Sequence, residues 1–292
     1  MDVSALPICA ADFAIDDFFI QALRSYVQEV SETFALKLDT LEGISIAENF
    51  RGFTNGFDTG FGPQDRLDVS ELAAGVTPQV LRDGQLGSHV ILRRSRINLF
   101  GRREQSEPRN EARYTIAHEL AHADEHCRAG KQFAEQLVQL HMTPDPFQVG
   151  RRAVWSEYYV CRKIASTHPA MLSTLQELLV RSTEEFGNDC ATARARIAAS
   201  NDKAGIHGRL CGTAFRVFSD ASRLLGHVDG LGNGFKTACP IAVTYIEDAK
   251  LTSTFEDLHS KLKVLWDSFP NWSDLNDLQP ILVVIDAALK KV

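Results

Sequence analysis

The sequence predicts an α+β fold that is mostly helical and contains a small sheet. Apolar residues recur at every third or fourth position in several long segments, which is typical of amphipathic helices. Short stretches with partly alternating apolar and polar residues, typical of strands, occur only before residue 100. From Pro169 onward nearly every segment has the helical pattern. We therefore predict two parts, residues 1–169 with the sheet and a helical C-terminal region at residues 170–292.

The first predicted elements are one helix and a few strands. Residues 14–38 form the helix, and its apolar positions repeat at three and four: Phe18, Leu23, Val27, Val30 and Phe34. The segment GISIAENF from Gly43 predicts a short strand, and HVILRRSRINLF at residues 89–100 predicts a strand or strand pair. The Gly- and Phe-rich residues 52–66 predict a loop, whose aromatic side chains either line a substrate site or anchor the loop on the core.

Three helices and one turn are predicted after this region. A helix begins near Pro108, since proline is tolerated in a first turn, and Ser106 is the candidate cap. KQFAEQLVQLHM from Lys131 predicts a separate helix, and RRAVWSEYYVCRKIAS from Arg151 predicts a third. The later GHVDGLGNGF follows a helix instead of a strand and lacks the spacing of a phosphate loop, so it predicts a turn.

The overall composition argues against several classes of partner. The net charge of −7 and the pI of 5.7 give no general attraction to nucleic acid or anionic lipid, so direct nucleic-acid binding is not expected. The basic cluster Arg93–Arg96 is interpreted as a solvated strand edge and its loop, with contact to a partner or to nucleic acid as the alternative. No apolar run approaches the ~20 residues of a membrane helix, and the N-terminus lacks signal-peptide features. We expect a cytoplasmic protein whose six scattered cysteines are small buried residues.

The strongest signal for chemistry is YTIAHELAHADEH, residues 114–126, which contains the HExxH pattern as His118, Glu119 and His122. Residues four apart in a helix stand above one another, so two imidazoles can bind one Zn²⁺ at about 2.0–2.1 Å each. Glu119 is rotated to the side of this pair and can reach a water on the metal. The alternative is a pair of hydrogen-bonded, metal-free histidines on a helix face.

A zinc site needs a third protein ligand, with water in the fourth position if it is catalytic. His126 lies about 80° off the face of the pair, and no glycine breaks the helix before Gly130; Glu125 lies a turn beyond the pair. We favour Glu157, because a carboxylate in an apolar helix stripe is costly unless an ion such as zinc neutralises it. Glu157 could instead pair with a core arginine or histidine, or face solvent. Cys161, one turn later, is either a ligand or a packing residue.

The segment ARYTIAHELAH resembles the ImmA/IrrE family of zinc-dependent metallopeptidases, which are bacterial and phage proteins. The resemblance covers residues 40–170. It implies a zincin-like, gluzincin-like metallopeptidase domain at residues 1–169. It also implies a ligand set of His118, His122 and Glu157 with Glu119 as the catalytic residue.

Two departures from the family pattern are visible. Ala121 stands where the family often has glycine. The segment SEYYVCRKIAS around Glu157 resembles the family's third-ligand segment only weakly, and its spacing from the HExxH motif is longer. These departures leave the expected metal ligands His118, His122 and Glu157 in place, and they leave the substrate open.

The motif and the resemblance together predict a zinc-dependent endopeptidase, with Glu119 as general base on a zinc-bound water. The family's association with repressor cleavage implies a specific regulatory protein as substrate, a transcriptional regulator among the candidates. One alternative is a non-catalytic, zinc-stabilised protein-interaction module, and another is a metal-dependent hydrolase of a small molecule. A substrate could extend along the strand at residues 88–100. The candidate oxyanion donors are Tyr158, Tyr159, His126 and His168.

Overall fold

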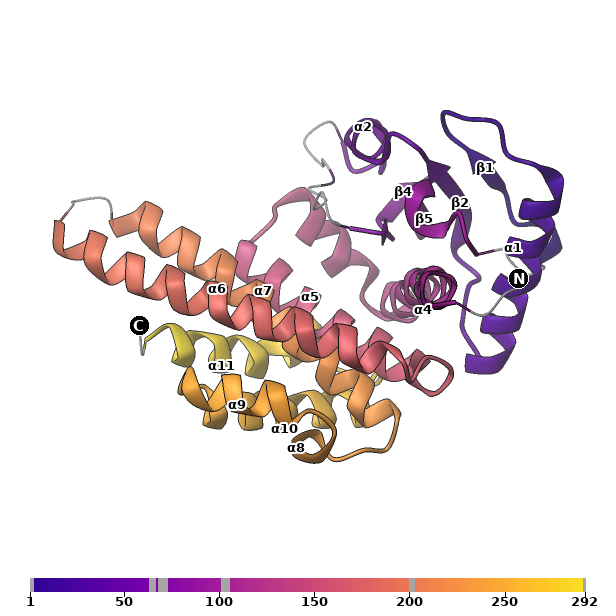
Figure 1. Cartoon of the computed structure of the whole chain (residues 1–292). Helices are drawn as coiled ribbons and strands as arrows, with labels where there is room; N and C mark the ends of the chain where they lie inside the picture. Colours follow the sequence, from indigo (N-terminus) through magenta and orange to yellow (C-terminus); the bar gives the residue numbers. More distant parts are fainter. Residues whose placement is uncertain (1–2, 63–66, 68–72, 101–105, 200–202, 291–292) are drawn as a thin grey trace. The chain divides into compact units, whose positions relative to one another are not determined.

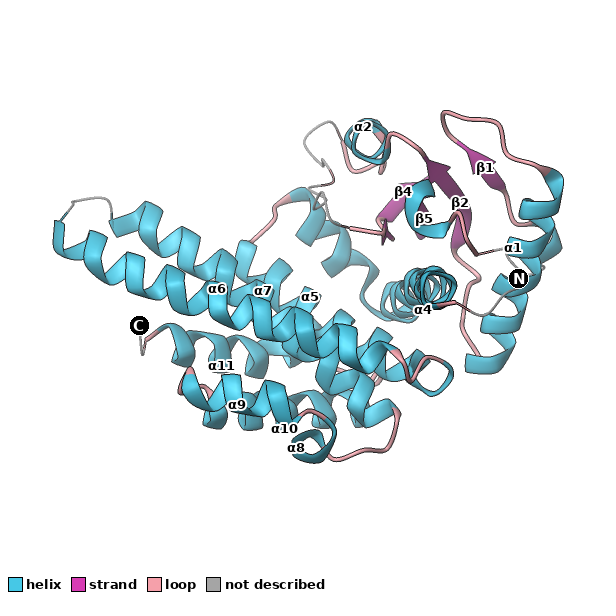
Figure 2. Ribbon diagram, viewed as in Figure 1, coloured by secondary structure: helices cyan, strands magenta, loops and turns pink. Residues whose placement is uncertain are grey.

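The computed structural model describes residues 3–62, 67, 73–100, 106–199 and 203–290 (Figure 1). Two compact units are present, Met1–Pro144 and Asp145–Val292. The described chain is mostly helical with one small mixed sheet, which confirms the predicted α+β class at this level (Figure 2). The limit between the units lies before the predicted division at residues 169 and 170, so the helix that carries Glu157 belongs to the second unit.

The first unit contains the sheet, whose strand order is β1-β2-β5-β3, with β4 also paired to β5. Strands β1, β2 and β5 are parallel, and β3 and β4 are antiparallel to β5. The elements of this unit are η1 (Val3–Ala5), β1 (Ile8–Ala10), α1 (Asp17–Phe34), β2 (Leu41–Ala47), α2 (Phe50–Gly56), β3 (Gly75–Val76), β4 (Gln79–Arg82), β5 (Gln85–Arg93), α3 (Arg94–Ile97) and α4 (Glu107–Met142).

Helix α1 confirms the first predicted helix. Asp16 caps it, because its carboxylate accepts a hydrogen bond from the Phe19 amide at 2.6 Å. The predicted core positions Leu23 and Val27 are fully buried. Phe18 was wrongly assigned to the apolar face, since it lies in the first turn and is 72% exposed.

Two local predictions in the first unit were right only in part, and a third was wrong. Residues 94–97 form the short helix α3, so the strand ends at Arg93. The predicted loop at residues 52–66 begins inside helix α2, which Asn49 caps through its side chain, and residues 63–66 lie outside the described part. Strand β5 is paired on both sides, by β2 and by β3 with β4, so its described residues offer no edge to an extended substrate.

Helix α4 carries the HExxH motif and packs on β5 and α1. It begins after Ser106 with Pro108 in its first turn, as predicted, although the Ser106 side chain makes no capping hydrogen bond. The helix continues to Met142, and Phe133 alone has non-helical dihedral angles (φ −124°, ψ 28°). The kink lies two residues after the predicted start of the second helix at Lys131, so the two predicted helices are joined end to end in α4. Phe133 itself is buried.

The second unit consists of helices, among which α5, α6 and α7 pack most extensively. A Cβ atom at Gly226 would stand 2.3 Å from the Tyr158 carbonyl oxygen, and one at Gly230 would stand 2.4 Å from that of Arg162. Only glycine at these positions allows α5 and α7 to approach this closely. The elements are α5 (Pro146–Ile164), η2 (Ala165–Thr167), α6 (Met171–Ala199), α7 (Lys203–Gly230), α8 (Phe235–Ala238), α9 (Pro240–Asp248), α10 (Thr252–Ser268), η3 (Leu275–Leu278) and α11 (Gln279–Leu289).

Two expectations from composition can be compared with the described residues. Among them, no helix has both the length and the apolar character needed to cross a membrane. The six cysteines are free thiols, and five of them are buried, as expected for small packing residues. Cys9 is the exception because it lies exposed on the short strand β1.

Candidate metal centre

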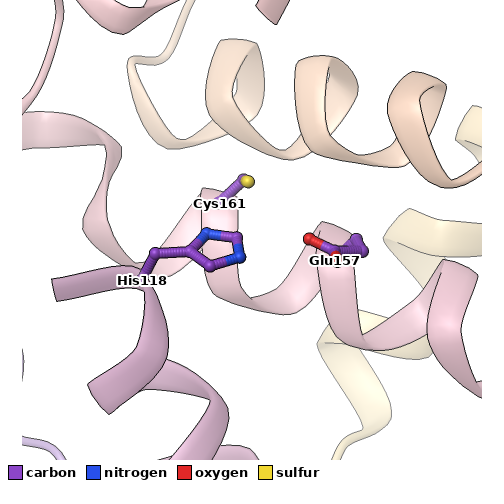
Figure 3. Close-up of side chains that lie close together, drawn as sticks. All are labelled: His118, Glu157 and Cys161. Atoms are coloured by element: carbon purple, nitrogen blue, oxygen red, sulfur yellow. The ribbon is translucent and has the colours of Figure 1, made fainter. Parts of the chain in front are cut away.

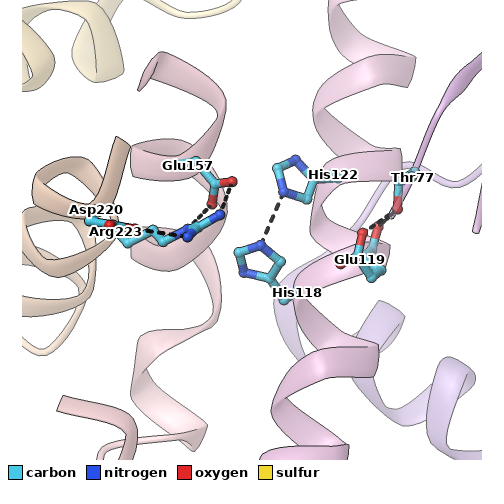
Figure 4. Close-up of polar contacts among 7 residues, drawn as sticks. All are labelled: Thr77, His118, Glu119, His122, Glu157, Asp220 and Arg223. Carbon is cyan, nitrogen blue, oxygen red and sulfur yellow. Dashed lines mark hydrogen bonds and ion pairs between the residues drawn. The ribbon is translucent and has the colours of Figure 1, made fainter. Parts of the chain in front are cut away.

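Helix α4 brings together two of the predicted ligands, His118 and His122 (Figure 4). Their Nε2 atoms are 3.1 Å apart, and the rings meet edge to face with centroids separated by 4.7 Å. Both side chains are half-buried. The apolar residues just before and between them are fully buried: Ile116, Ala117, Leu120 and Ala121.

The separation of the imidazole nitrogens fits a zinc ion. Tetrahedral zinc with two bonds of about 2.05 Å to nitrogen places those nitrogens roughly 3.3 Å apart. The observed 3.1 Å is close to this value. It equally fits a hydrogen bond in which one neutral ring donates to the other. The geometry is therefore that of a preformed nitrogen pair, which can bind a metal once both Nε2 lone pairs are available.

Glu119 lies on a different side of α4 from the histidine pair (Figure 4). It is only 6% exposed. The Thr77 hydroxyl lies 2.8 Å from its Oε2 atom and 3.0 Å from its backbone oxygen. A Cβ at Gly75 would stand 2.8 Å from the Glu119 Cγ, so the β3 backbone also lies directly against this side chain. The carboxylate is thus directed to Thr77, on a different side of the helix from the histidine pair.

The other acids of the motif have a different role. Asp124 is fully buried and accepts hydrogen bonds from the Lys37 amide at 2.5 Å and from Arg128 Nε at 2.9 Å. It fastens α4 to the segment after α1, a structural function that the sequence analysis missed. Glu125 is also fully buried, and its Oε2 lies 3.8 Å from His126 Nε2.

Glu157 lies in the second unit on α5 and forms a two-point ion pair with Arg223 of α7 (Figure 4). Arg223 donates from Nε to Oε2 at 2.8 Å and from Nη2 to Oε1 at 2.6 Å. Its Nη1 donates to Asp220 at 2.9 Å. Burial by itself would lower the pKa of Arg223, but Glu157 and Asp220 raise that pKa well above its ordinary value. The guanidinium therefore stays charged between two carboxylates.

This ion pair corresponds to the alternative in which Glu157 pairs with a core arginine. The cost of burying the carboxylate is already offset by Arg223, so burial by itself no longer requires a zinc ion there. Ligation remains chemically open, because each carboxylate oxygen has a second lone pair and metal-bound carboxylates commonly accept such hydrogen bonds. Cys161 is buried one helical turn after Glu157 on α5. His118 of the first unit and these two side chains of the second all have metal-ligand chemistry (Figure 3).

Two of the candidate oxyanion donors are parts of the core of the second unit. The Tyr158 hydroxyl donates to Asp229 at 2.6 Å and accepts from Arg162 at 2.7 Å. Burial raises the pKa of Tyr158 far above its usual range, and Asp229 adds to the effect. Tyr159 is 5% exposed, and its ring packs edge to face on Phe269 at 5.3 Å. Both tyrosines therefore have structural roles that account for their presence.

Comparison with known proteins adds nothing to the geometry. No family model matches the sequence, and neither a curated protein nor a solved structure matches it. The likeness to the ImmA/IrrE family thus depends on the motif residues alone.

Proposed function

We propose that the protein is a zinc-dependent endopeptidase that cleaves a specific protein, with a regulatory protein as the expected target. The observation that carries the proposal is the 3.1 Å separation of His118 Nε2 and His122 Nε2 on α4, with Glu119 next to the pair. A helix presenting two imidazoles and one buried carboxylate in this order supplies both metal ligands and a base.

Glu119 has the central role in the proposed chemistry. A bound zinc ion would lower the pKa of a water molecule and polarise a peptide carbonyl. Glu119 would take the proton of that water and pass it to the leaving amine nitrogen. The Thr77 hydroxyl holds this carboxylate at 2.8 Å on a different side of α4 from the histidine pair, so the side chain would turn toward the metal for both transfers.

We also propose Glu157 as the third ligand, with Cys161 as its alternative. In this arrangement Arg223 would orient the Glu157 carboxylate through its two hydrogen bonds, as neighbouring groups do for metal-bound carboxylates. The metal would then be held by His118, His122 and Glu157, and one position would remain for water.

A second candidate function is a non-catalytic, zinc-stabilised protein-interaction module. The ion pair between Glu157 and Arg223 favours it, because a carboxylate that is already neutralised gains less from a metal. In that case the histidine pair could bind zinc without producing an open catalytic site.

The substitution Glu119→Gln separates the two functions. It keeps the size of the side chain but removes the base, so zinc should remain bound while cleavage falls by about 100-fold or more. The inactive variant is used to co-purify the target, and the trapped protein is then incubated with the wild-type enzyme and analysed for fragments by mass spectrometry. Glu135→Gln, at an exposed position on the same helix, is the matched control and should cleave normally.

Two results would refute the endopeptidase proposal. In one, the wild type leaves the trapped protein intact while both proteins stay bound, which is the behaviour of an interaction module. In the other, Glu119→Gln cleaves at the wild-type rate, so that the base lies elsewhere.

A further inference from the structure

The second unit contains a pocket of about 300 Å³ among helices α7, α8, α9 and α10. Its floor is apolar and consists of the buried side chains Leu225, Ile246 and Phe255. Val243 and Phe235, both half-buried, are also part of the apolar lining. The volume is at the lower end of that of small-molecule sites, and the combination of an apolar floor with a few polar groups is typical of them.

The opening of the pocket has an excess of negative charge. Lys236 on α8 donates to Glu256 on α10 at 2.9 Å, and this ion pair joins the two helices at the rim. Glu247 on α9 adds a second carboxylate. With two carboxylates and one ammonium group, the rim carries one net negative charge and favours a cationic group on the ligand.

One wall is fixed by a partly buried network of hydrogen bonds and ion pairs. His259 lines the pocket, and its Nε2 lies 2.9 Å from an Asp229 carboxylate oxygen. Asp229 also accepts the Tyr158 hydroxyl at 2.6 Å and lies 3.4 Å from Lys263 Nζ. These contacts connect α10 with α7 and α5. The pocket is therefore preformed, which reduces the entropy lost when a ligand binds.

We propose that this pocket binds a small apolar molecule that carries a protonated amine. Its hydrocarbon part would cover Leu225, Ile246 and Phe255, and its ammonium group would face Glu247 at the rim. The small volume excludes a folded protein segment, and the rim charge disfavours a carboxylate. None of the residues that line the pocket is a candidate metal ligand, so this proposal is independent of the endopeptidase proposal.

Phenethylamine is a suitable probe, because its phenyl ring matches the apolar floor and its amine is protonated at neutral pH. Binding to the full chain is measured by isothermal titration calorimetry and compared with phenethyl alcohol and phenylpropionate, which have similar size. The amine should bind about twofold to fivefold more tightly than the alcohol, the range expected for one exposed charge pair. The carboxylate should bind most weakly.

Three variants locate the binding. Val243→Phe fills the pocket and should weaken phenethylamine binding by about tenfold or more, whereas Val283→Phe on α11, where Val283 is 59% exposed, should leave it unchanged. Glu247→Gln changes an exposed rim residue without touching the core, and it should remove the preference for amine over alcohol. Circular dichroism confirms that each variant is folded.

The proposal is overturned if none of the three probes binds, or if the alcohol or carboxylate binds as tightly as the amine. It is also overturned if folded Val243→Phe binds phenethylamine like the wild type. If Val243→Phe does not fold, the Glu247→Gln result decides, and an unchanged preference for the amine refutes the assigned class of ligand.

Discussion

The two units each place a polar centre on a helix that is otherwise packed in a core, and the two centres differ in their charge balance. On α4, His118 and His122 present two electron-pair donors 3.1 Å apart. On α5, Glu157 is bound by the guanidinium of Arg223 at two points. The first arrangement suits an added cation, whereas the second already contains one. The comparison shows that residue type alone does not identify a metal ligand, because the partner decides what the side chain can still bind.

The two centres also differ in how locally they are determined. The histidine pair follows from a spacing of four residues in one helix. Glu157 and Arg223 are 66 positions apart, and their ion pair depends on the close contact of α5 and α7. Changes in the α5–α7 contact should therefore alter the second centre and leave the first intact.

The largest effect is expected for Gly226→Ala. The new Cβ would meet the Tyr158 carbonyl oxygen at 2.3 Å, so α7 must move away from α5 at a cost of about 3 kcal/mol in the free energy of unfolding. Gly212→Ala on the same helix is the matched control. Apart from its chain neighbours and its own helix backbone, no atom of the described residues lies within 4 Å of its added Cβ, and it should stabilise by up to about 1 kcal/mol. Equal effects of the two substitutions in urea titrations would contradict the close α5–α7 contact.

A smaller loss, about 2 kcal/mol, is expected for Arg223→Met, which leaves the Glu157 carboxylate buried without its cation. The double variant with Glu157→Gln should recover part of the loss, since Asp220 is then the one carboxylate left without the Arg223 cation. If Glu157 is also a zinc ligand, saturating zinc should stabilise Arg223→Met relative to its metal-free form more than it stabilises the double variant. Equal stabilisation of both would make Glu157 a partner of Arg223 only.

Per pH unit, the smallest change in the free energy of unfolding is expected from a pH dependence of stability. One histidine of each unit contributes to it. Burial lowers the pKa of His89 to about 4, with Arg82 adding to the effect, and burial lowers that of His227 to about 4 as well. Because the folded-state pKa lies below the unfolded value of 6.5, their stabilisation is complete above pH 6.5. It is lost as the pH falls toward 4, by about 1.4 kcal/mol per pH unit for each histidine.

His227→Gln tests the contribution of the second unit. Between pH 6.5 and 4, the slope of unfolding free energy against pH should be smaller in this variant. The decrease should correspond to roughly one proton fewer taken up on unfolding. If the unfolding free energy of the wild type stays constant or rises as the pH falls from 6.5 to 4, neither imidazole is buried in its neutral form.

Much of the fold was predictable where the information is local. The repeat in α1 and the HExxH helix were identified because helical contacts join residues three or four apart. Strands β1, β3 and β4 were missed, since they contain two to four residues and depend on pairing with distant partners. The separate helix predicted from Lys131 corresponds to the part of α4 after Phe133, where non-helical dihedral angles kink the element.

The same difference between local and distant information applies to the candidate metal centre. His118, Glu119 and His122 lie on one helix as their spacing predicts, with Glu119 to one side of the pair. The sequence could not show that Arg223 would neutralise Glu157 or that Thr77 would hold Glu119, because both partners are more than 40 residues away. Asp124 was grouped with metal-binding side chains by proximity in sequence, whereas its hydrogen bonds to Lys37 and Arg128 make it structural.

The most direct test of the central claim is the zinc affinity of the purified full chain, measured by competition with a chelating indicator. The wild type should bind about one zinc ion per chain. His118→Ala should weaken binding by about 100-fold or more, Glu157→Ala by about tenfold or more, and the control His141→Ala, farther along α4, should change nothing. Wild-type zinc affinity in His118→Ala would contradict the proposed centre altogether, and wild-type affinity in Glu157→Ala would remove Glu157 from it.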